Sequence, residues 1–122
     1  MSLAGVGIDL VEVARMEKSL QNPRFITRVF GVSEQALLTG PRRFERAAAN
    51  FAAKEAFSKA MGTGIRGFSL SEVEVLRDGL GAPYLCLSGA AAELARGRGL
   101  RFSVSLTHER GMAAAVVMAE RD

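Results

Sequence analysis

The chain has 122 residues, of which 48% are hydrophobic and 24% are charged, and its formal net charge at pH 7 is +3. These values are typical of one globular domain spanning 1–122, and no apolar run approaches the ~18 residues of a membrane span. The N-terminal residues lack the basic start and apolar run of a signal peptide, so we expect a cytoplasmic protein without membrane attachment.

The first part of the sequence predicts one strand followed by helices. Residues 3–8 have the composition of a buried strand, which runs into Asp9. Ser33 has the residue type and position of a helix N-cap, and Gly62 those of a helix C-terminus. Apolar spacing and turn residues place the helices at 11–20, about 24–30, 34–38 and 42–61.

The second part of the sequence has mainly the period of strands. Residues 72–87 predict a hairpin with a loop longer than two residues, and Ser88 is placed to cap a short helix. Residues 102–107 alternate in polarity, 108–111 predict a turn, and Met112–Ala119 is apolar throughout, which suits a strand covered on both faces. The fold class is therefore α+β, with an antiparallel-leaning sheet of about five strands packed on one long helix.

The segment FAAKEAFSKA, residues 51–60, is the strongest indication of a ligand site. Glu55 and Lys59 are four residues apart, so they lie on one face of the predicted long helix. A buried charge must be paired or bind a metal, so an acid and a base on an apolar face indicate a salt bridge or a ligand. The apolar residues of this face, which should be buried, are Phe44, Ala48 and Phe51.

Asp9 is a second acid in an apolar element. Because strands disfavour aspartate, its presence after the apolar residues 6–8 needs a reason. Alone, Asp9 is as consistent with a helix cap as with a ligand, and Glu55 alone is as consistent with a salt bridge to Lys59. Together, the two carboxylates are better explained by one hard cation between them. A small set of oxygen ligands suits Mg²⁺, which also takes waters and phosphate oxygens.

Three other features are weaker indications of function. Gly62-Thr63-Gly64 follows a helix instead of preceding one, so it is not a Walker loop, although its backbone N–H groups can contact a phosphate. His108 is the only histidine, and a structural role is its more frequent meaning. Cys86 cannot form an internal disulfide, which agrees with a reducing compartment. Its place in a strand favours a small core residue over a nucleophile.

Arginine is concentrated in the first half of the chain. A mildly basic surface suits an acidic protein or a phosphate-rich ligand. We expect no nucleic-acid binding because no basic-aromatic interleaving or reading motif accompanies the arginines. The clustered residues are Arg15, Arg24, Arg28, Arg42, Arg43 and Arg46.

Three blocks of the sequence point to a known family. They are VGIDLVEVARM near the start, FAAKEAFSKAMGTGI in the middle and SVSLTHERGMAAAVV near the end. Together they resemble the holo-[acyl-carrier-protein] synthases, the small bacterial 4′-phosphopantetheinyl transferases, over essentially the whole chain. The resemblance implies the phosphopantetheinyl transferase fold with one domain per chain. It also implies a homotrimer with active sites between subunits.

The same resemblance implies a reaction and its residues. Phosphopantetheine would pass from coenzyme A to a serine of apo-acyl carrier protein in fatty acid biosynthesis, and adenosine 3′,5′-bisphosphate would leave. Asp9 and Glu55 match the family's Mg²⁺ ligands, and Lys59 matches the lysine near the reacting phosphate. Gly62, Thr63 and Gly64 match the turn that contacts coenzyme A. His108 matches a histidine near the nucleotide end, contributed by the adjacent subunit.

The resemblance also suggests a docking surface and one departure from the family. Close relatives often have an arginine at position 50 that helps to hold coenzyme A phosphates, and here the residue is Asn50. Arg46, one turn earlier, is placed to compensate. The residues that match basic positions contacting the acidic carrier protein are Arg15, Arg24 and Arg28.

The implied mechanism uses the three charged residues together. Mg²⁺ would neutralise the leaving oxygens, Lys59 would add a fixed positive charge, and Glu55 would act as general base, directly or through a metal-bound water. The alternatives are a broad-specificity phosphopantetheinyl transferase for polyketide or peptide carrier domains, a non-catalytic module that binds nucleotides or acidic proteins, and a purely structural trimer. Neither non-catalytic alternative explains the paired carboxylates.

Overall fold

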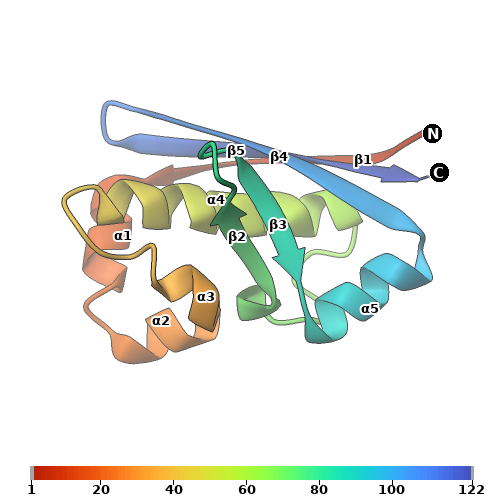
Figure 1. Cartoon of the computed structure of the whole chain (residues 1–122), viewed down its shortest axis with the longest axis horizontal. Helices are drawn as coiled ribbons and strands as arrows, with labels where there is room; N and C mark the ends of the chain where they lie inside the picture. Colours follow the sequence, from red (N-terminus) through yellow and green to blue (C-terminus); the bar gives the residue numbers. More distant parts are fainter. Residues whose placement is uncertain (1, 122) are drawn as a thin grey trace.

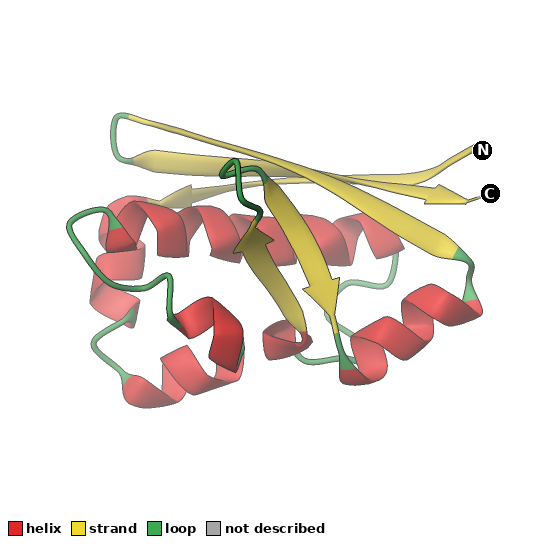
Figure 2. Cartoon of the chain, in the orientation of Figure 1, coloured by secondary structure: helices red, strands yellow, loops and turns green. Residues whose placement is uncertain are grey.

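The structure is a computed structural model that describes residues 2–121 (Figure 1). The long helix α4 lies against one face of a three-stranded sheet, and the hairpin and the smaller helices surround its other sides (Figures 1 and 2). In chain order the elements are β1 (Ser2–Glu12), α1 (Val13–Ser19), α2 (Pro23–Val29), α3 (Val32–Gln35), α4 (Arg43–Met61), the 3-10 turn η1 (Leu70–Glu72), β2 (Val73–Arg77), β3 (Pro83–Leu87), α5 (Gly89–Gly97), β4 (Leu100–Glu109) and β5 (Met112–Arg121).

The five strands form two antiparallel sheets. One has the order β1-β5-β4, and the other is the hairpin of β2 and β3. The α+β class is confirmed, but the prediction of a single sheet of about five strands is wrong. The hairpin packs Val73 and Val75, both fully buried, into the core around α4 instead of hydrogen-bonding to the larger sheet.

Strand β1 and helix α4 meet at their backbones. A Cβ atom on Gly7 would lie 1.8 Å from the carbonyl oxygen of Ala56, and one on Gly5 would lie 2.1 Å from that of Ala60. Only glycine fits at either position, since any other residue would push the strand and the helix apart. This close approach holds Asp9, two positions after Gly7, beside the C-terminal turns of α4.

The predicted helices are confirmed with changed ends. The prediction that Ser33 is an N-cap is wrong, because α3 begins at Val32 with Gly31 at its N-cap. There the Glu34 carboxylate accepts a hydrogen bond from the Gly31 N–H at 3.2 Å. This N–H lies at the start of the helix and has no partner within it, so the glutamate supplies the missing acceptor. Helix α4 ends as predicted, with Gly62 in the left-handed conformation.

The environment of Asp9 excludes one of its two interpretations. Asp9 lies inside β1, and α1 begins only at Val13, with Glu12 as N-cap residue. The cap interpretation is therefore wrong.

The turn after β4 is shorter than predicted, because His108 lies within the strand.

The outer face of the three-stranded sheet is apolar and open. Alternate residues of β5 are buried against α4, but the prediction of cover on both faces is wrong for the single chain, since no element within residues 2–121 lies over the other face. On that face Met118 is 42% exposed and Ile8 is 64% exposed. We call this surface the outer apolar face; it consists of Val6, Ile8, Leu10, Ala114, Val116 and Met118.

None of the helices within residues 2–121 combines the length and the apolar character needed to cross a membrane.

Candidate active site

Asp9, Glu55 and Lys59 form one group between β1 and α4. The Lys59 ammonium lies 3.6 Å from Asp9 Oδ1 and donates a hydrogen bond to the Ile8 carbonyl at 2.8 Å. Burial raises the pKa of Glu55, and the negative charge of Asp9 raises it further, whereas the charges of Lys59 and Arg15 lower it. The two carboxylates are therefore close enough to repel each other, with one ammonium group beside them.

This group is half open to solvent. The prediction of a buried helix face is confirmed for Ala48 and Phe51. It is wrong for Phe44, which is half-buried, and for Lys59, whose side chain is 56% exposed. Lys59 stays at the surface because its ammonium donates to the Ile8 carbonyl of β1 instead of entering the core. A ligand can approach the three charged groups without displacing any part of the core.

The donor atoms of this group suit a hard cation. Within residues 2–121 no three or more His, Cys, Asp or Glu side chains are arranged to hold a metal ion. Asp9 and Glu55 thus offer carboxylate oxygens only, a set that suits Mg²⁺ with waters and phosphate oxygens as further ligands and does not suit zinc. A cation between the two carboxylates would also remove the repulsion that raises the pKa of Glu55.

The Gly62-Thr63-Gly64 turn continues from this group. The Gly62 N–H donates to the Lys59 carbonyl at 3.0 Å, and Gly62 and Gly64 have φ angles of 78° and 65°. The helix-stop interpretation is therefore confirmed. The turn starts within one helical turn of Lys59. A contact between its backbone N–H groups and a phosphate held near Lys59 stays a prediction.

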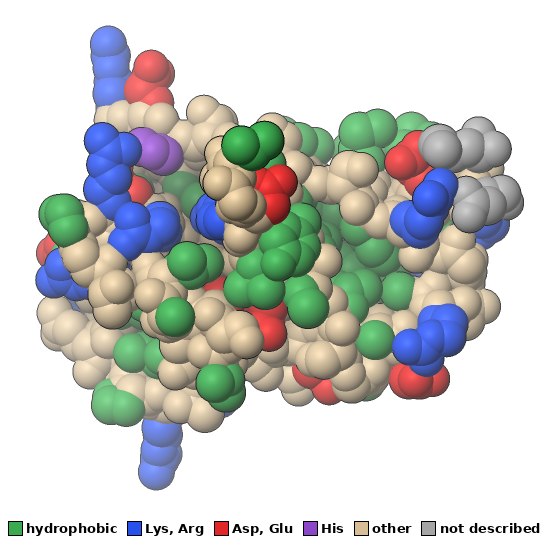
Figure 3. Space-filling model, in the orientation of Figure 1, with side chains coloured by type: hydrophobic (Ala, Val, Ile, Leu, Met, Phe, Trp, Pro, Cys, Tyr) green, Lys and Arg blue, Asp and Glu red, His purple; other side chains and the backbone are tan. Residues whose placement is uncertain are grey.

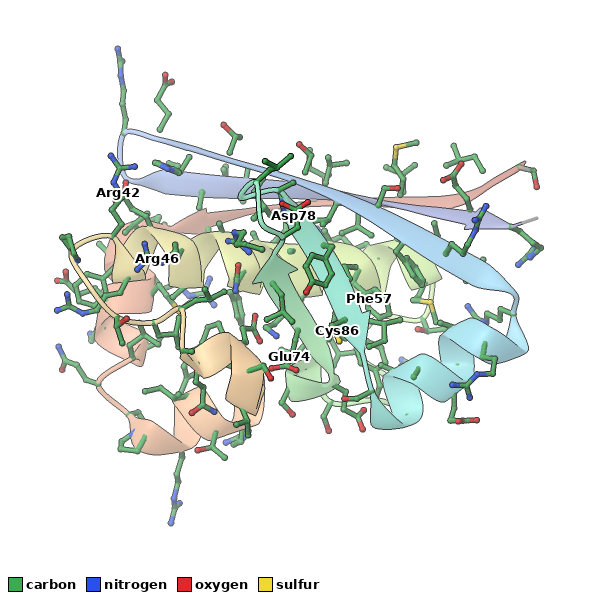
Figure 4. All side chains as sticks on the ribbon, viewed as in Figure 1. Arg42, Arg46, Phe57, Glu74, Asp78 and Cys86 are labelled. Atoms are coloured by element: carbon green, nitrogen blue, oxygen red, sulfur yellow. The ribbon has the colours of Figure 1, made fainter. Side chains whose placement is uncertain are left out.

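His108 lies in a different place, which we call the arginine pocket. Its Nδ1 atom lies 3.2 Å from the Glu45 carboxylate. It lines a cavity of about 410 Å³ between α4, the hairpin and β4. In Figure 3 the only histidine lies among basic side chains, and Figure 4 labels two of them, Arg42 and Arg46. The third arginine of the pocket is Arg77, from β2.

The arginine pocket and the carboxylate group face opposite sides of α4. Arg46 and Glu55 are nine positions apart, which is about two and a half helical turns. In the sheet, Asp9 belongs to β1 at one edge and His108 to β4 at the other edge. One chain therefore presents two separate sites.

A buried ion pair between Lys54 and Glu34 was not predicted from the sequence. Lys54 Nζ lies 2.6 Å from Glu34 Oε1, and both side chains are fully buried. Lys54 also donates to the Val73 carbonyl at 2.6 Å and the Leu70 carbonyl at 3.1 Å. Burial lowers the pKa of Lys54 and raises that of Glu34, and the opposite charge of the partner counteracts each shift. No buried side-chain polar atom of the described residues lacks a partner, so this pair is a closed structural element.

Asn50 belongs to the same buried network. Its amide donates to Glu34 Oε2 at 2.9 Å and to the Val75 carbonyl at 3.1 Å. Its Oδ1 atom accepts a hydrogen bond from Arg77 at 2.9 Å. Position 50 therefore faces the hairpin, and Arg46 and Arg77 are the arginines that reach the pocket.

The three arginines expected to contact a partner are exposed on α1 and α2. The Arg15 guanidinium lies 5.8 Å from the centre of the Phe51 ring. Arg28 lines a further cavity, of about 620 Å³, together with Phe51. These observations place Arg15 and Arg28 on the same side of the molecule as Glu55.

The core interpretation of Cys86 is wrong. Its side chain is exposed, and it pairs with Glu74 across the hairpin, where Figure 4 labels both residues. The neighbouring residues Leu85 and Leu87 instead pack against the core.

Comparisons with known proteins agree with this description. The family model of the 4′-phosphopantetheinyl transferase superfamily matches 5–117. The holo-[acyl-carrier-protein] synthase of Lachnoclostridium phytofermentans is 41% identical over 117 residues, which are 95% of this chain and 94% of that protein. The synthase of Treponema denticola is 41% identical over 121 residues, which are 97% of this chain and 98% of that protein.

Solved structures of such synthases have the same fold. The Neisseria meningitidis synthase aligns with a TM-score of 0.90 and 32% identity, covering 98% of this chain and 100% of that chain. The Bacillus anthracis synthase, solved in complex with CoA (3′,5′-ADP), aligns with a TM-score of 0.82 and 35% identity, covering 98% of both chains.

Proposed function

The chain belongs to the 4′-phosphopantetheinyl transferase superfamily, and from its full-length match to holo-[acyl-carrier-protein] synthases we infer that it transfers phosphopantetheine from coenzyme A to a serine of apo-acyl carrier protein. The observation that carries this proposal is the group of Asp9, Glu55 and Lys59 at the junction of β1 and α4. A non-catalytic module or a structural trimer has no use for two mutually repelling carboxylates at a solvent-open site.

Asp9 and Glu55 would hold Mg²⁺. When bound, the ion supplies neutralisation of the charge that develops on the leaving phosphate oxygens. Lys59 is held beside this position by its hydrogen bond to the Ile8 carbonyl. Its ammonium would therefore place a positive charge close to the reacting phosphate, and its position is already fixed before the substrate binds.

Glu55 is the residue best placed to accept the serine proton. In the transfer, the serine oxygen forms a bond to the phosphorus that carries pantetheine, and the bond from that phosphorus to the departing bisphosphate breaks. The proton of the serine hydroxyl passes to the Glu55 carboxylate, directly or through a water. General base catalysis typically contributes about 10²–10⁴-fold.

We propose that the active unit is a homotrimer. The carboxylate group and the arginine pocket are on opposite sides of α4, so both can reach one coenzyme A only if they come from neighbouring chains. A contact between two different surfaces repeats head to tail and forms a ring when its rotation closes. The family resemblance implies a ring of three. The outer apolar face supports this assembly, because exposed apolar patches of this kind usually mark interaction sites. Contacts to coenzyme A would come from the Gly62-Thr63-Gly64 turn and from His108.

The carrier protein would dock beside Glu55. The exposed arginines of α1 and α2 lie on that side of the molecule and suit an acidic partner. This arrangement would bring the acceptor serine to the carboxylate group. The names of the relatives favour acyl carrier protein over other carrier domains. A role in fatty acid biosynthesis and a cytoplasmic location stay predictions. The proposed docking residues are Arg15, Arg24 and Arg28.

The direct test is mass spectrometry of an apo-acyl carrier protein incubated with coenzyme A, Mg²⁺ and this protein. We expect a mass gain of one phosphopantetheine group, and no gain when a chelator removes the metal. No gain with Mg²⁺, using a carrier that another holo-synthase does modify, would reject the proposed activity. A gain that persists in excess chelator would reject the metal requirement alone.

A further inference from the structure

Arg77 reaches the arginine pocket in an orientation fixed by the buried network. Its Nη2 atom donates to Asn50 Oδ1 at 2.9 Å, and its Nη1 atom lies 3.4 Å from the Val75 carbonyl. Asn50 is itself fully buried and bonded to Glu34 and to the Val75 carbonyl. The amide of Asn50 therefore cannot turn away. Together with the carbonyls of Val75 and Leu76, the latter 3.3 Å from Nη1, it fixes the guanidinium at the wall of the cavity.

The arginine pocket has an excess of positive charge. Arg46 donates its Nε hydrogen to the Leu37 carbonyl at 2.8 Å, and a second nitrogen donates to the Thr39 carbonyl. Neither Arg46 nor Arg77 forms a salt bridge with a carboxylate of residues 2–121. The one carboxylate of the lining, Glu45, contacts His108 instead. Two fixed guanidinium groups without a carboxylate partner make a site for an anion.

The proposed substrate has an anion of the required kind. Coenzyme A carries a pyrophosphate, which must lie at the reacting centre, and a separate phosphate monoester at the 3′ position of its ribose. The N–H groups that Arg77 does not use within the protein can donate charge-assisted hydrogen bonds to the monoester oxygens. The adenosine end of the substrate would occupy the cavity, which opens beside the apolar residues Val104, Leu106 and Pro83.

We propose that Arg77 binds the 3′-phosphate of coenzyme A and so determines the preference for it over 3′-dephospho-coenzyme A. Asn50 is the positioning residue that directs Arg77 into the pocket. This inference rests on the proposed function, because it concerns the same substrate.

The test compares coenzyme A with 3′-dephospho-coenzyme A as donors, using the full-length protein and apo-acyl carrier protein. The wild type should prefer coenzyme A. Arg77→Met should raise the KM for coenzyme A about 10- to 100-fold, the range expected when a hydrogen bond to a charged group is lost. It should leave kcat and the KM for the dephospho donor nearly unchanged. Arg77→Lys should restore part of the preference, since it keeps the charge without the fork.

The role of Asn50 is tested by a double-mutant cycle. Asn50→Ala should also weaken the preference for coenzyme A, and adding it to Arg77→Met should cause no further loss, because the two residues act as one unit. Asn50→Ser is the second variant if Asn50→Ala does not fold, since its hydroxyl is polar but shorter than the amide. Equal losses with both donors in the folded variant would show a general structural role and would overturn the positioning claim.

Controls separate this inference from the proposed function. Arg96→Met changes an exposed arginine of α5 outside the pocket and should leave both donors unaffected. If the wild type transfers phosphopantetheine but Arg77→Met keeps the full preference for coenzyme A, the proposed function stands and the inference is wrong. A raised KM for the carrier protein, with the KM for coenzyme A unchanged, would also overturn it. If the wild type modifies no carrier, the proposed function itself fails.

Discussion

Lys54 and Glu55 are neighbours in α4, yet they lie in opposite kinds of environment. Lys54 points to the hairpin and forms a fully buried ion pair with Glu34, in which each polar atom has a partner. Glu55 points to β1, where it is half-buried beside a second carboxylate, and where Lys59 is more than half exposed. One turn of one helix therefore holds both a closed ionic group and an open one.

The difference shows how the same residue types serve stability or chemistry. A buried ion pair is costly to break, because the remaining charge has no solvent to replace its partner. An exposed pair contributes little to stability, and its charges remain available to a ligand. The carboxylates at the open group even repel each other, which folding alone would not favour. Variants on the hairpin side of α4 should therefore change the free energy of unfolding, and variants on the β1 side should change the rate of transfer.

The largest expected effect is on activity at the open group. Asp9→Ala or Glu55→Ala should lower the transfer rate at saturating Mg²⁺ by about 10³-fold or more, because either change removes one of the two proposed carboxylate ligands of the cation. Thermal unfolding should change little, since each change also removes the repulsion between the carboxylates. Rates come from mass spectrometry of the carrier protein. Near-normal transfer by either variant would exclude these residues as metal ligands.

Two lysine variants test the comparison directly. Lys54→Met should lower the free energy of unfolding by about 3–5 kcal/mol, because it leaves Glu34 charged and buried without its partner. Lys59→Met should change it by less than about 1 kcal/mol. The same variant should reduce kcat about 10²–10³-fold, as loss of a fixed charge at a transition state does. Chemical denaturation and steady-state kinetics measure the two effects. A reversed pattern would show that the roles of the two lysines are exchanged.

Charge reversal on α1 and α2 should act on the partner alone. Replacing Arg15, Arg24 and Arg28 together with glutamate should raise the KM for the carrier protein by about tenfold or more and spare that for coenzyme A. The effect should shrink as salt increases, because exposed charges are screened. If the KM for the carrier protein does not change at low salt, the docking surface lies elsewhere.

The smallest expected effect is a change in the pKa of Glu55, in the open group, without a change in the pKa of Glu34, in the closed group. Asp9→Asn should lower this pKa, because it removes the negative charge that helps to raise it, and should leave the pKa of Glu34 unchanged. In the wild type the folded protein retains the Glu55 proton to a higher pH than the unfolded chain. Ionisation of Glu55 therefore costs stability as pH rises above the ordinary glutamate range. NMR titration of the metal-free protein measures both groups, and an unchanged Glu55 would mean that the carboxylates do not interact.

The open group could be predicted from the sequence because its signals are local. Glu55 and Lys59 are one turn apart, and the charge of Asp9 stands out in an apolar strand. The stop at Gly62 also depends only on a residue that adopts the left-handed conformation.

The closed group could not be predicted, because it depends on which distant elements pack together. Glu34 and Lys54 are 20 positions apart in helices of different length, and nothing in either segment identifies the other. Cys86 shows the same limit in a strand. Its alternation with Leu85 and Leu87 separates two faces, but only the packing of the hairpin decides which face is buried. For the same reason, the sequence could not show that β2 and β3 form a sheet of their own instead of joining β1, β5 and β4.

The backbone contact at Gly5 and Gly7 restricts how enzymes of this kind can diverge. In the proposed assembly, changes on the outer apolar face would alter how copies associate, and changes in the arginine pocket would alter which donor is preferred. The interval between Asp9 and α4 is different, because main-chain atoms set it and no rotamer can adjust it. Under these proposed roles, association and donor preference can change while the interval between Asp9 and α4 stays fixed, provided that Gly5 and Gly7 never acquire a side chain.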